Sequence, residues 1–403
     1  MNSRTKWFVV SGSTCLTVML LVGSLLGKSA DQQSDVYKHL TVFSDVVAHI
    51  KSEYVEEPDM KAVTLGALNG MLEAIDPFAS YLNADQYRDY QRNKDLKRAG
   101  VGLILSKKFG YLGVVDAIPE SPAAKAGLVT GDMLEGINGI TTRDMALASA
   151  EMLLQGESGT PVELSVVRVR RPEPTKVSLI RANIVLPAVE SKIIDDGVGY
   201  VNIDALSPAL VKDVATAVQR LQKEGAKKLV VDVRSCATGT PDDGIALANL
   251  FLNKGRITYV KGQRYPQKNF DADPAKAITA LPMAVLTNSG TADAAEIMAA
   301  AVQDNKRGKV VGERTHGDAA VRQPITMDDG GVIILSVAKY YSPDGKAIQD
   351  TGVVPGTPIR EAEVQMEFDD NGLPIVSTKD LEEKKKTEND PVVKKALEAL
   401  ANG

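Results

Sequence analysis

The segment SPAAKAGLVTGDMLEGING, residues 121–139, decides how the middle of the chain folds. Ser121 is a helix-capping residue and Gly127 a typical helix end, so a short helix is expected between them. Residues 131–139 have the pattern of a strand that closes in an Asn-Gly turn. This segment therefore predicts a small domain in which short strands surround one capped helix.

The residues before this segment continue the pattern. Residues 100–105 form a glycine-rich loop entering a strand, and 113–118 form a second strand. In this order the segments resemble a PDZ domain over residues 98–184, which implies a groove that takes an extended peptide by strand addition. The alternative is a folded spacer with an unused groove. The resemblance implies that the peptide's terminal carboxylate meets the backbone amides of Gly100, Val101, Gly102 and Leu103.

Predicted strands and helices alternate from residue 186 to residue 360. Repeated β–α units of this kind predict a sheet with helices on its faces, in which the chemistry lies where strands end and helices begin. Buried strands are expected at 199–203, 229–233, 283–287, 310–312 and 332–338, and helices at 210–221, 245–251 and 292–304.

The two ends of the chain differ from its middle. Two basic residues precede an apolar run from Trp7 to Leu26, which predicts either a secretion signal or an uncleaved membrane anchor within residues 1–30. An exported protein, periplasmic or held at the membrane by this segment, is therefore expected. Residues 31–97 show helical spacing of apolar residues, and residues 363–403 predict a charged extension, solvated or used in assembly, with a short helix at 392–400.

Composition excludes several classes of function. The 403 residues carry 47 basic and 52 acidic side chains, a net charge of −5, so the chain lacks the basic surface that binds nucleic acid. The few histidines and cysteines are scattered, which excludes a zinc module built on them and predicts no cofactor: they are His39, His49, His316, Cys15 and Cys236.

The order of these regions, and four short motifs within them, resemble the carboxyl-terminal processing peptidases, also called tail-specific proteases. The resemblance covers nearly all of the chain after residue 30 and implies a ClpP/crotonase-like α/β core. The motifs that carry it are Asp232-Val233-Arg234, Gly290-Thr291-Ala292-Asp293-Ala294-Ala295-Glu296-Ile297, Val311-Gly312-Glu313-Arg314-Thr315-His316-Gly317-Asp318 and Ala338-Lys339-Tyr340-Tyr341-Ser342-Pro343-Asp344-Gly345.

Peptidases of this family use a serine nucleophile, a lysine base and a glutamine that orients the lysine. The resemblance places the nucleophile at Asp293, the base at Asp318 and the orienting residue at Arg322. An aspartate has no hydroxyl to acylate, a carboxylate replaces the neutral amine, and an arginine stays charged. The sequence therefore predicts that no catalytic residue is intact and that serine–lysine proteolysis is lost.

The turn that forms the oxyanion hole in the family has also changed. The resemblance places its paired glycines at Thr238 and Gly239, so one glycine remains, and a β-branched threonine resists conformations open to glycine. Three neighbours could replace the nucleophile: Ser289, Thr291 and Cys236. We interpret the two hydroxyls as helix caps and the thiol as a small buried filler.

Asp293 and Asp318 could also form a carboxylate pair for acid–base hydrolysis, or bind a metal ion with His316. The alternative is a structural Asp-Arg-Asp cluster in which Arg322 neutralises both carboxylates. We favour the cluster because it leaves the charges balanced.

The sequence as a whole predicts an α+β multidomain chain with a helical region, a PDZ-like β-barrel domain and an α/β core at 185–362. Its predicted function is that of a pseudopeptidase that binds C-terminal or unfolded polypeptide segments. The rival hypotheses are a peptidase with a non-standard nucleophile, and an inactive partner of an active homologue or of further copies of itself.

Overall fold

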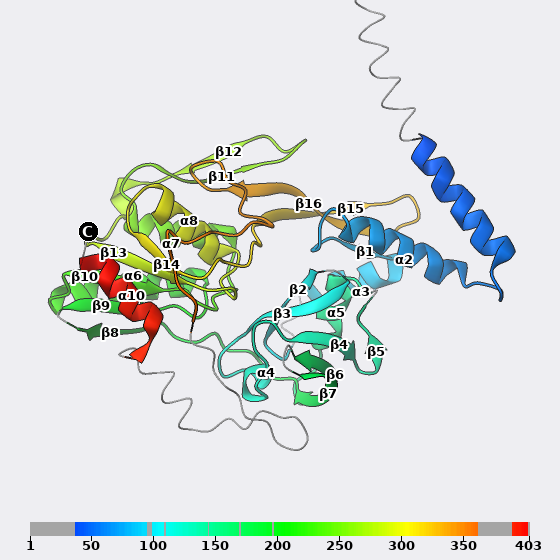
Figure 1. Ribbon diagram of the computed structural model, residues 1–403, viewed down its shortest axis with the longest axis horizontal. Coiled ribbons are helices and arrows are strands. Elements are labelled where there is room, and N and C mark those ends of the chain that lie inside the picture. The colour runs from blue at the N-terminus through cyan, green and yellow to red at the C-terminus, as the bar shows by residue number, and fades with distance from the viewer. Residues whose placement is uncertain are drawn as a thin grey trace, which may run out of the picture. The chain divides into compact units, whose positions relative to one another are not determined.

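The computed structural model describes residues 37–94, 99–108, 110–143, 145–168, 171–195, 197–361 and 389–401 (Figure 1). The chain divides into two compact units, residues 1–67 and 68–403. The predicted signal or anchor at 1–30 lies outside the described residues. Among the helices that are described, none combines the length and the hydrophobicity that crossing a bilayer requires.

The first unit is helical. Residues 37–53 form one helix, and α2 (Met60–Glu73) begins in this unit and continues into the second. Leu40, Phe43 and Val46 recur at helical spacing along the first helix, and all three side chains are exposed.

The second unit contains the predicted PDZ domain, whose sheet has the strand order β2-β3-β4-β6-β7, with β5 paired to β4. Ser121 caps α4 through its side chain, which accepts a hydrogen bond from the amide of Ala124 at 3.2 Å. Asn138 and Gly139 have φ values of 52° and 77°, so they form the predicted turn between β4 and β5. The elements of the domain are β2 (Leu103–Lys108), β3 (Tyr111–Ala117), α4 (Pro122–Lys125), β4 (Met133–Ile137), β5 (Ile140–Thr141), α5 (Leu147–Leu154), β6 (Pro161–Arg168) and β7 (Arg171–Ile180).

The α/β core is built on a second sheet with the strand order β17-β14-β13-β10-β9-β8. All neighbouring strands are parallel except β8, which pairs antiparallel to β9. The strands β9, β10 and β13 agree with the predicted buried runs. The strands are β8 (Glu190–Ile194), β9 (Val198–Asn202), β10 (Lys228–Asp232), β13 (Met283–Thr287), β14 (Lys309–Gly312) and β17 (Thr357–Pro358).

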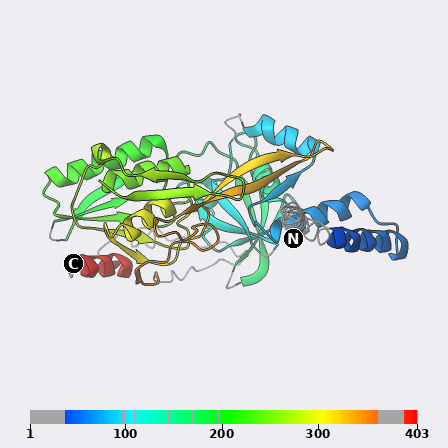
Figure 2. The same ribbon diagram turned by 90° about the horizontal axis from the view of Figure 1, so that it is seen from above.

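Helices cover both faces of this sheet (Figure 2). One face packs against α6 (Pro208–Lys223), α7 (Pro241–Phe251) and α8 (Ala294–Asp304). The opposite face packs against α10 (Pro391–Ala401), which buries Val392, Val393, Ala396 and Leu400. The prediction of a solvated or assembly segment is therefore wrong for this helix. Its apolar stripe covers the open face of the sheet, while residues 362–388 lie outside the described part.

A third sheet has the order β1-β16-β11-β12, with β15 paired to β16. Its long strand β16 pairs with β1 near the start of the second unit and with β11 of the core region. The mixed α+β multidomain fold, with N-terminal helices, a PDZ domain and an α/β core, confirms the predicted fold class. The remaining elements are β1 (Ser80–Leu82), α3 (Ala84–Lys94), β11 (Arg256–Lys261), β12 (Lys268–Asp271), the short 3-10 helix η1 (Pro274–Lys276), β15 (Ala320–Thr326) and β16 (Val332–Tyr341).

Candidate functional site

Two neighbouring strands of the central sheet bring Asp293 and Asp318 to the same edge. The strands β13 and β14 are parallel, with Thr287 opposite Gly312 at their carboxyl ends. The loop after β13 leads to Asp293 at the start of α8, and the loop after β14 leads to Asp318. Arg322 follows in β15. Carboxyl ends of parallel strands are where α/β folds place their sites.

The carboxylate of Glu296 joins these two loops. It accepts hydrogen bonds from the backbone amides of Asp293 at 3.0 Å, Gly317 at 2.7 Å and Asp318 at 2.8 Å, and from the Thr315 hydroxyl. Complete burial raises its pKa to about 7, although these hydrogen bonds oppose the shift. The sequence analysis gave Glu296 no role. Its position three residues after Asp293, the spacing of a capping box, was the available signal.

The backbone at Asp293 has an uncommon conformation, with φ of 47° and ψ of −109°. A residue other than glycine held at such angles costs on the order of 1–3 kcal/mol and persists only where its surroundings impose it. A sharp turn from a strand into a helix is also how α/β hydrolases present a nucleophile. Asp293 therefore combines a backbone suited to a reacting side chain with a side chain that has no hydroxyl.

The charges at the site are only partly paired. The Arg322 guanidinium forms an ion pair with Asp318, and its Cζ atom lies 4.4 Å from the centre of the Phe78 ring. Among the described residues no ion pair joins Arg322 to Asp293, whose buried Oδ1 atom has no hydrogen-bond partner. Burial, followed by the charge of Asp318, raises the pKa of Asp293 well above its usual range and favours its protonated form.

The expected Asp-Arg-Asp cluster is therefore wrong in one respect. Arg322 and Asp318 are four residues apart and meet directly, whereas Asp293 comes from the preceding loop and is left outside the ion pair. The charge of Asp318 is neutralised by Arg322, whereas desolvation favours the neutral form of Asp293.

The turn that contains Thr238 and Gly239 lies beside the start of α8. A Cβ atom on Gly239, which has φ of +100°, would be 2.7 Å from the Cβ atom of Leu206 and 3.3 Å from that of Ala294, so only glycine fits. The Thr238 hydroxyl accepts a hydrogen bond from the Leu206 amide at 2.9 Å. The threonine is thus bound to the neighbouring loop, and the one remaining glycine occupies a position where it is required.

The three alternative nucleophiles differ in accessibility. The Thr291 hydroxyl is buried and donates a hydrogen bond to the carbonyl of Val233 at 2.8 Å, so its role is structural, but the prediction that it caps the helix is wrong because α8 has Asp293 at its N-cap. Cys236 is completely buried, and burial raises the pKa of its thiol, so a thiolate is disfavoured there. Ser289 is exposed in the loop before α8.

His316 lies in the same loop as Asp318, where its ring packs edge-on against Phe78 with centroids 6.3 Å apart. In the part of the chain that the structure describes, no three side chains of the histidine, cysteine, aspartate or glutamate type are grouped to hold a metal ion. His316 and the two aspartates do not form such a group.

The predicted carboxylate-binding loop of the PDZ domain is partly used by the fold itself. The amide of Gly100 donates to the carbonyl of Ala182 at 3.0 Å, so it is not available to a peptide, which corrects the prediction for this residue. Neither Val101 nor Gly102 uses its amide within the described residues. Leu103 begins β2, which pairs only with β3 and is the edge strand of the sheet.

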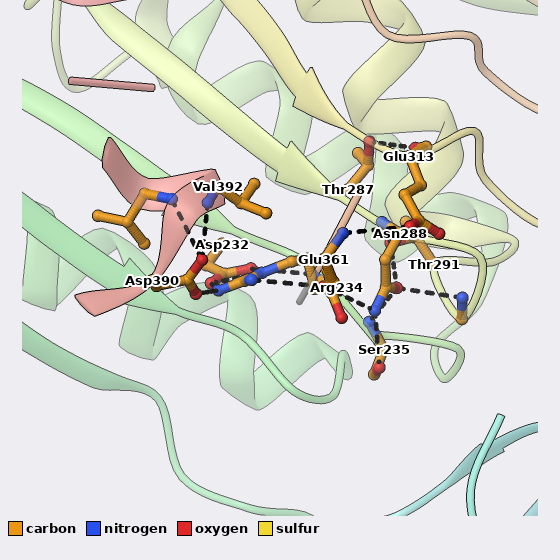
Figure 3. Close-up of polar contacts among 12 residues, drawn as sticks. Asp232, Arg234, Ser235, Thr287, Asn288, Thr291, Glu313, Glu361, Asp390 and Val392 are labelled. Carbon is orange, nitrogen blue, oxygen red and sulfur yellow. Dashed lines mark hydrogen bonds and ion pairs between the residues drawn. The ribbon is translucent and has the colours of Figure 1, made fainter. Parts of the chain in front are cut away.

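A partly buried network around Arg234 was missed by the sequence analysis (Figure 3). The guanidinium binds both carboxylate oxygens of Asp232, and it also pairs with Glu361 at 3.3 Å and Asp390 at 2.7 Å. The other oxygen of Asp390 accepts from the amide of Val392, in the first turn of α10. Glu361 and Asp390 come from beyond residue 360, and sequence spacing alone does not connect them to Arg234.

The network continues toward the candidate site (Figure 3). Glu361 also accepts a hydrogen bond from the side chain of Asn288 at 3.2 Å. The carbonyl oxygen of the Asn288 side chain accepts from the amides of Ser235 at 2.8 Å and Gly290 at 3.1 Å. Asn288 thus ties the turn before Thr238 to the loop before Asp293.

A PDZ domain joined to an α/β core with a strained helix start is the architecture of a processing peptidase, and comparison with known proteins agrees. Residues 197–359 match the model of peptidase family S41, and residues 113–168 match that of the PDZ domain. The carboxy-terminal-processing protease of Bartonella bacilliformis is 30% identical over 357 residues, covering 87% of this chain and 82% of that protein. For carboxy-terminal processing protease CtpA of Bacillus subtilis the identity is 31% over 337 residues, covering 82% and 71%.

A solved structure, that of a photosystem II D1 C-terminal processing protease, is similar in three dimensions. It has a TM-score of 0.66 and 27% identity, and the match covers 77% of this chain and 85% of the other. The chain belongs to the family of carboxyl-terminal processing proteases, peptidase family S41, and carries a PDZ domain.

Proposed function

We propose that this protein binds the C-terminal segments of other polypeptides without cleaving them by the serine–lysine mechanism of its family. The observation that carries the proposal is the chemistry at the start of α8, where Asp293, Asp318 and Arg322 lie together. A carboxyl group cannot be acylated as a hydroxyl can, and at the base position a carboxylate, that of Asp318, is held in an ion pair with Arg322. The fold of the peptidase is kept without its reacting groups.

The edge of the PDZ sheet supports the binding half of the proposal. An edge strand such as β2 has unpaired backbone groups to which a peptide adds as a further strand. The helix α5 packs beside β2, and Val101 and Gly102 present amides without partners among the described residues. These are the parts that recognise an extended segment and its terminal carboxylate.

Two further parts of the proposal rest on the sequence. The basic and apolar start of the chain supports export, with the protein periplasmic or anchored by residues 1–30. Ser289 is the exposed hydroxyl next to the site, so a peptidase with a different nucleophile is the alternative that the assay below must address.

The first test is a cleavage assay with the full chain. We expect no cleavage of an unfolded protein with an apolar C-terminus, under conditions in which an active member of the family degrades it. Asp293→Ala and Ser289→Ala should leave any trace activity unchanged. Activity abolished by Asp293→Ala would overturn the proposal, and activity abolished by Ser289→Ala would favour the alternative nucleophile.

The second test measures peptide binding to the same full chain. A peptide with a free apolar C-terminus should bind at about the micromolar level, and amidation of that C-terminus should weaken binding about tenfold, since charge-assisted hydrogen bonds are lost. Indistinguishable titration curves for the two peptides would mean that the PDZ domain serves as a spacer.

A matched pair of glycine variants locates the binding. Both glycines have positive φ, but a Cβ atom on Gly102 would clash with Ser121 at 2.2 Å, whereas one on Gly131 would meet nothing within 4 Å. Gly102→Ala should weaken peptide binding, and Gly131→Ala should not. Circular dichroism and thermal melting show that each variant is folded.

A further inference from the structure

A cavity of about 670 Å³ lies beside the candidate site, between the PDZ domain and the third sheet. Its walls come from α3, β1, α5 and β15, together with β16 and the residues just before β1. Its lining combines aromatic rings with two charged side chains, those of Glu151 and Arg322. The aromatic residues are Phe78, Tyr87 and Tyr90.

The two faces of α5 have different environments. Ala150 and Leu154 belong to the core of the PDZ domain, Ala148 and Glu151 line the cavity, and Leu147 belongs to both. The Glu151 side chain forms no hydrogen bond or ion pair with any described residue, whereas its backbone carbonyl accepts from the amide of Gln155. Its side chain is open to the cavity, and desolvation by the surrounding protein raises its pKa to about 7, against the influence of Arg322. A carboxylate in this setting lacks a cation.

The guanidinium of Arg322 is engaged in an ion pair, although its buried Nε atom has no hydrogen-bond partner among the described residues. Arg322 pairs with Asp318, and Asp293 has no cationic partner within ion-pair distance among the described residues. Four carboxyl groups act on this one guanidinium, those of Asp318, Asp76, Asp293 and Glu151, and of these Asp293 is favoured in its neutral form. The local balance favours a positively charged occupant over a negatively charged one.

The aromatic rings fit the same kind of occupant. Tyr87 and Tyr90 stack with ring centroids 6.2 Å apart, and the charge of Glu151 acts on Tyr90, which places the carboxylate near these rings. The ring of Phe78 already binds a guanidinium, that of Arg322. Aromatic faces beside a carboxylate are a combination that binds ammonium and guanidinium groups.

We propose that this cavity binds a lysine or arginine side chain of the polypeptide held by the PDZ domain, with Glu151 as its counter-charge. The inference rests on the proposed peptide-binding function and gives that function a sequence preference. The helix α5 borders both the proposed peptide groove, beside β2, and the cavity. A helix is about 10 Å wide and an extended chain covers about 3.3 Å per residue, so a peptide that leaves the groove reaches the cavity within a few residues.

The experiment compares peptides that differ by one charge. A free-acid peptide with an apolar C-terminus is prepared with lysine, norleucine or glutamate at each of several upstream positions, and its binding to the full chain is measured by fluorescence anisotropy. At one position lysine should bind about tenfold more tightly than norleucine. Equal binding at all positions overturns the proposal, and a preference for glutamate would assign the cavity to anions through Arg322.

Glu151→Gln keeps the shape of the side chain and should remove the lysine preference while leaving the norleucine peptide unaffected. Glu157→Gln, at an exposed glutamate in the loop after α5, is the matched control and should retain it. Loss of the preference in both variants, or in neither, contradicts the role of Glu151.

A smaller probe separates this inference from the proposed function. N-acetyl-lysine methylamide, added at millimolar concentration, should shift NMR signals of Tyr87 and Tyr90, and the neutral norleucine analogue should not. This result requires no peptide in the groove. If no peptide binds but the lysine probe does, the proposed function fails and the cavity assignment stands. If the peptide binds but neither lysine reagent is preferred, the cavity assignment fails alone.

Discussion

Arg234 and Arg322 both lie among several carboxyl groups, but the number that each one binds differs. Arg234 contacts Asp232, Glu361 and Asp390, all within 3.3 Å at their shortest approach. Among the described residues, Arg322 forms an ion pair with Asp318 alone. An arginine that forms ion pairs with every neighbouring carboxylate holds elements of the fold in place. Where neighbouring carboxyl groups are not bound by the arginine, the protein can still accept a ligand.

The largest effect is expected for Arg234. Arg234→Ala should lower the free energy of unfolding by about 3–5 kcal/mol, because it leaves the buried carboxylate of Asp232 without its cation. Urea unfolding measures the change. Arg220→Ala, at an exposed arginine of α6 that binds Ser191, is the control and should cost less than about 1 kcal/mol. Similar losses in both variants would remove the distinction drawn here.

A smaller effect is expected at the second arginine. Arg322→Ala should destabilise the protein by about 2–3 kcal/mol, mainly through the charge left on Asp318. A double-mutant cycle with Asp318→Ala should therefore give a coupling energy clearly larger than a cycle with Asp293→Ala. Equal coupling to both aspartates would restore the three-residue ion cluster expected from the sequence.

The comparison extends to Asp116, a buried carboxyl group that forms no ion pair with any described residue. Asp116 of β3 is buried with its Oδ2 atom unpartnered, and burial, with a contribution from the charge of Asp204, raises its pKa to about 7. Because the folded state then binds a proton that the unfolded state releases near pH 4, this contribution to stability is complete at low pH. It is lost as the pH rises through about 7.

The free energy of unfolding should therefore fall by roughly 2 kcal/mol between pH 5 and pH 8 on account of Asp116. In Asp116→Asn this part of the pH dependence should disappear. Asp195→Asn, at an exposed aspartate after β8, should keep the slope of the unmodified protein. An unchanged slope in Asp116→Asn would show that the carboxyl group is solvated in solution.

Local patterns predicted the regular elements but not the long-range pairs. The apolar run at 283–287 coincides with β13, because a buried strand has a compositional signal of its own. The sequence analysis named β16 but missed β15, whose side chains are mostly exposed and which is defined by pairing with β16. A strand that is held mainly by pairing with its neighbour is difficult to recognise from its own sequence.

The candidate site shows the same division. The order of the motifs predicted that Asp293, Asp318 and Arg322 lie close together. The structure places the loops that lead to them at the ends of adjacent strands. The choice of partner for Arg322 depends on side-chain reach, which spacing does not give. Nothing in the local sequence around Glu151 indicated that one face of its helix borders a cavity.

Two of the carboxylates that bind Arg234, those of Glu361 and Asp390, affect how long the chain between them can be. Glu361 and Asp390 bind the same guanidinium, so the backbone leaves and returns at one place. The entropy of closing a flexible segment between two fixed ends grows only logarithmically with its length, and doubling that length costs about 0.6 kcal/mol. Insertions between these two residues are therefore expected to be tolerated, and the stretch is a suitable position for a reporter peptide that leaves α10 seated on the sheet.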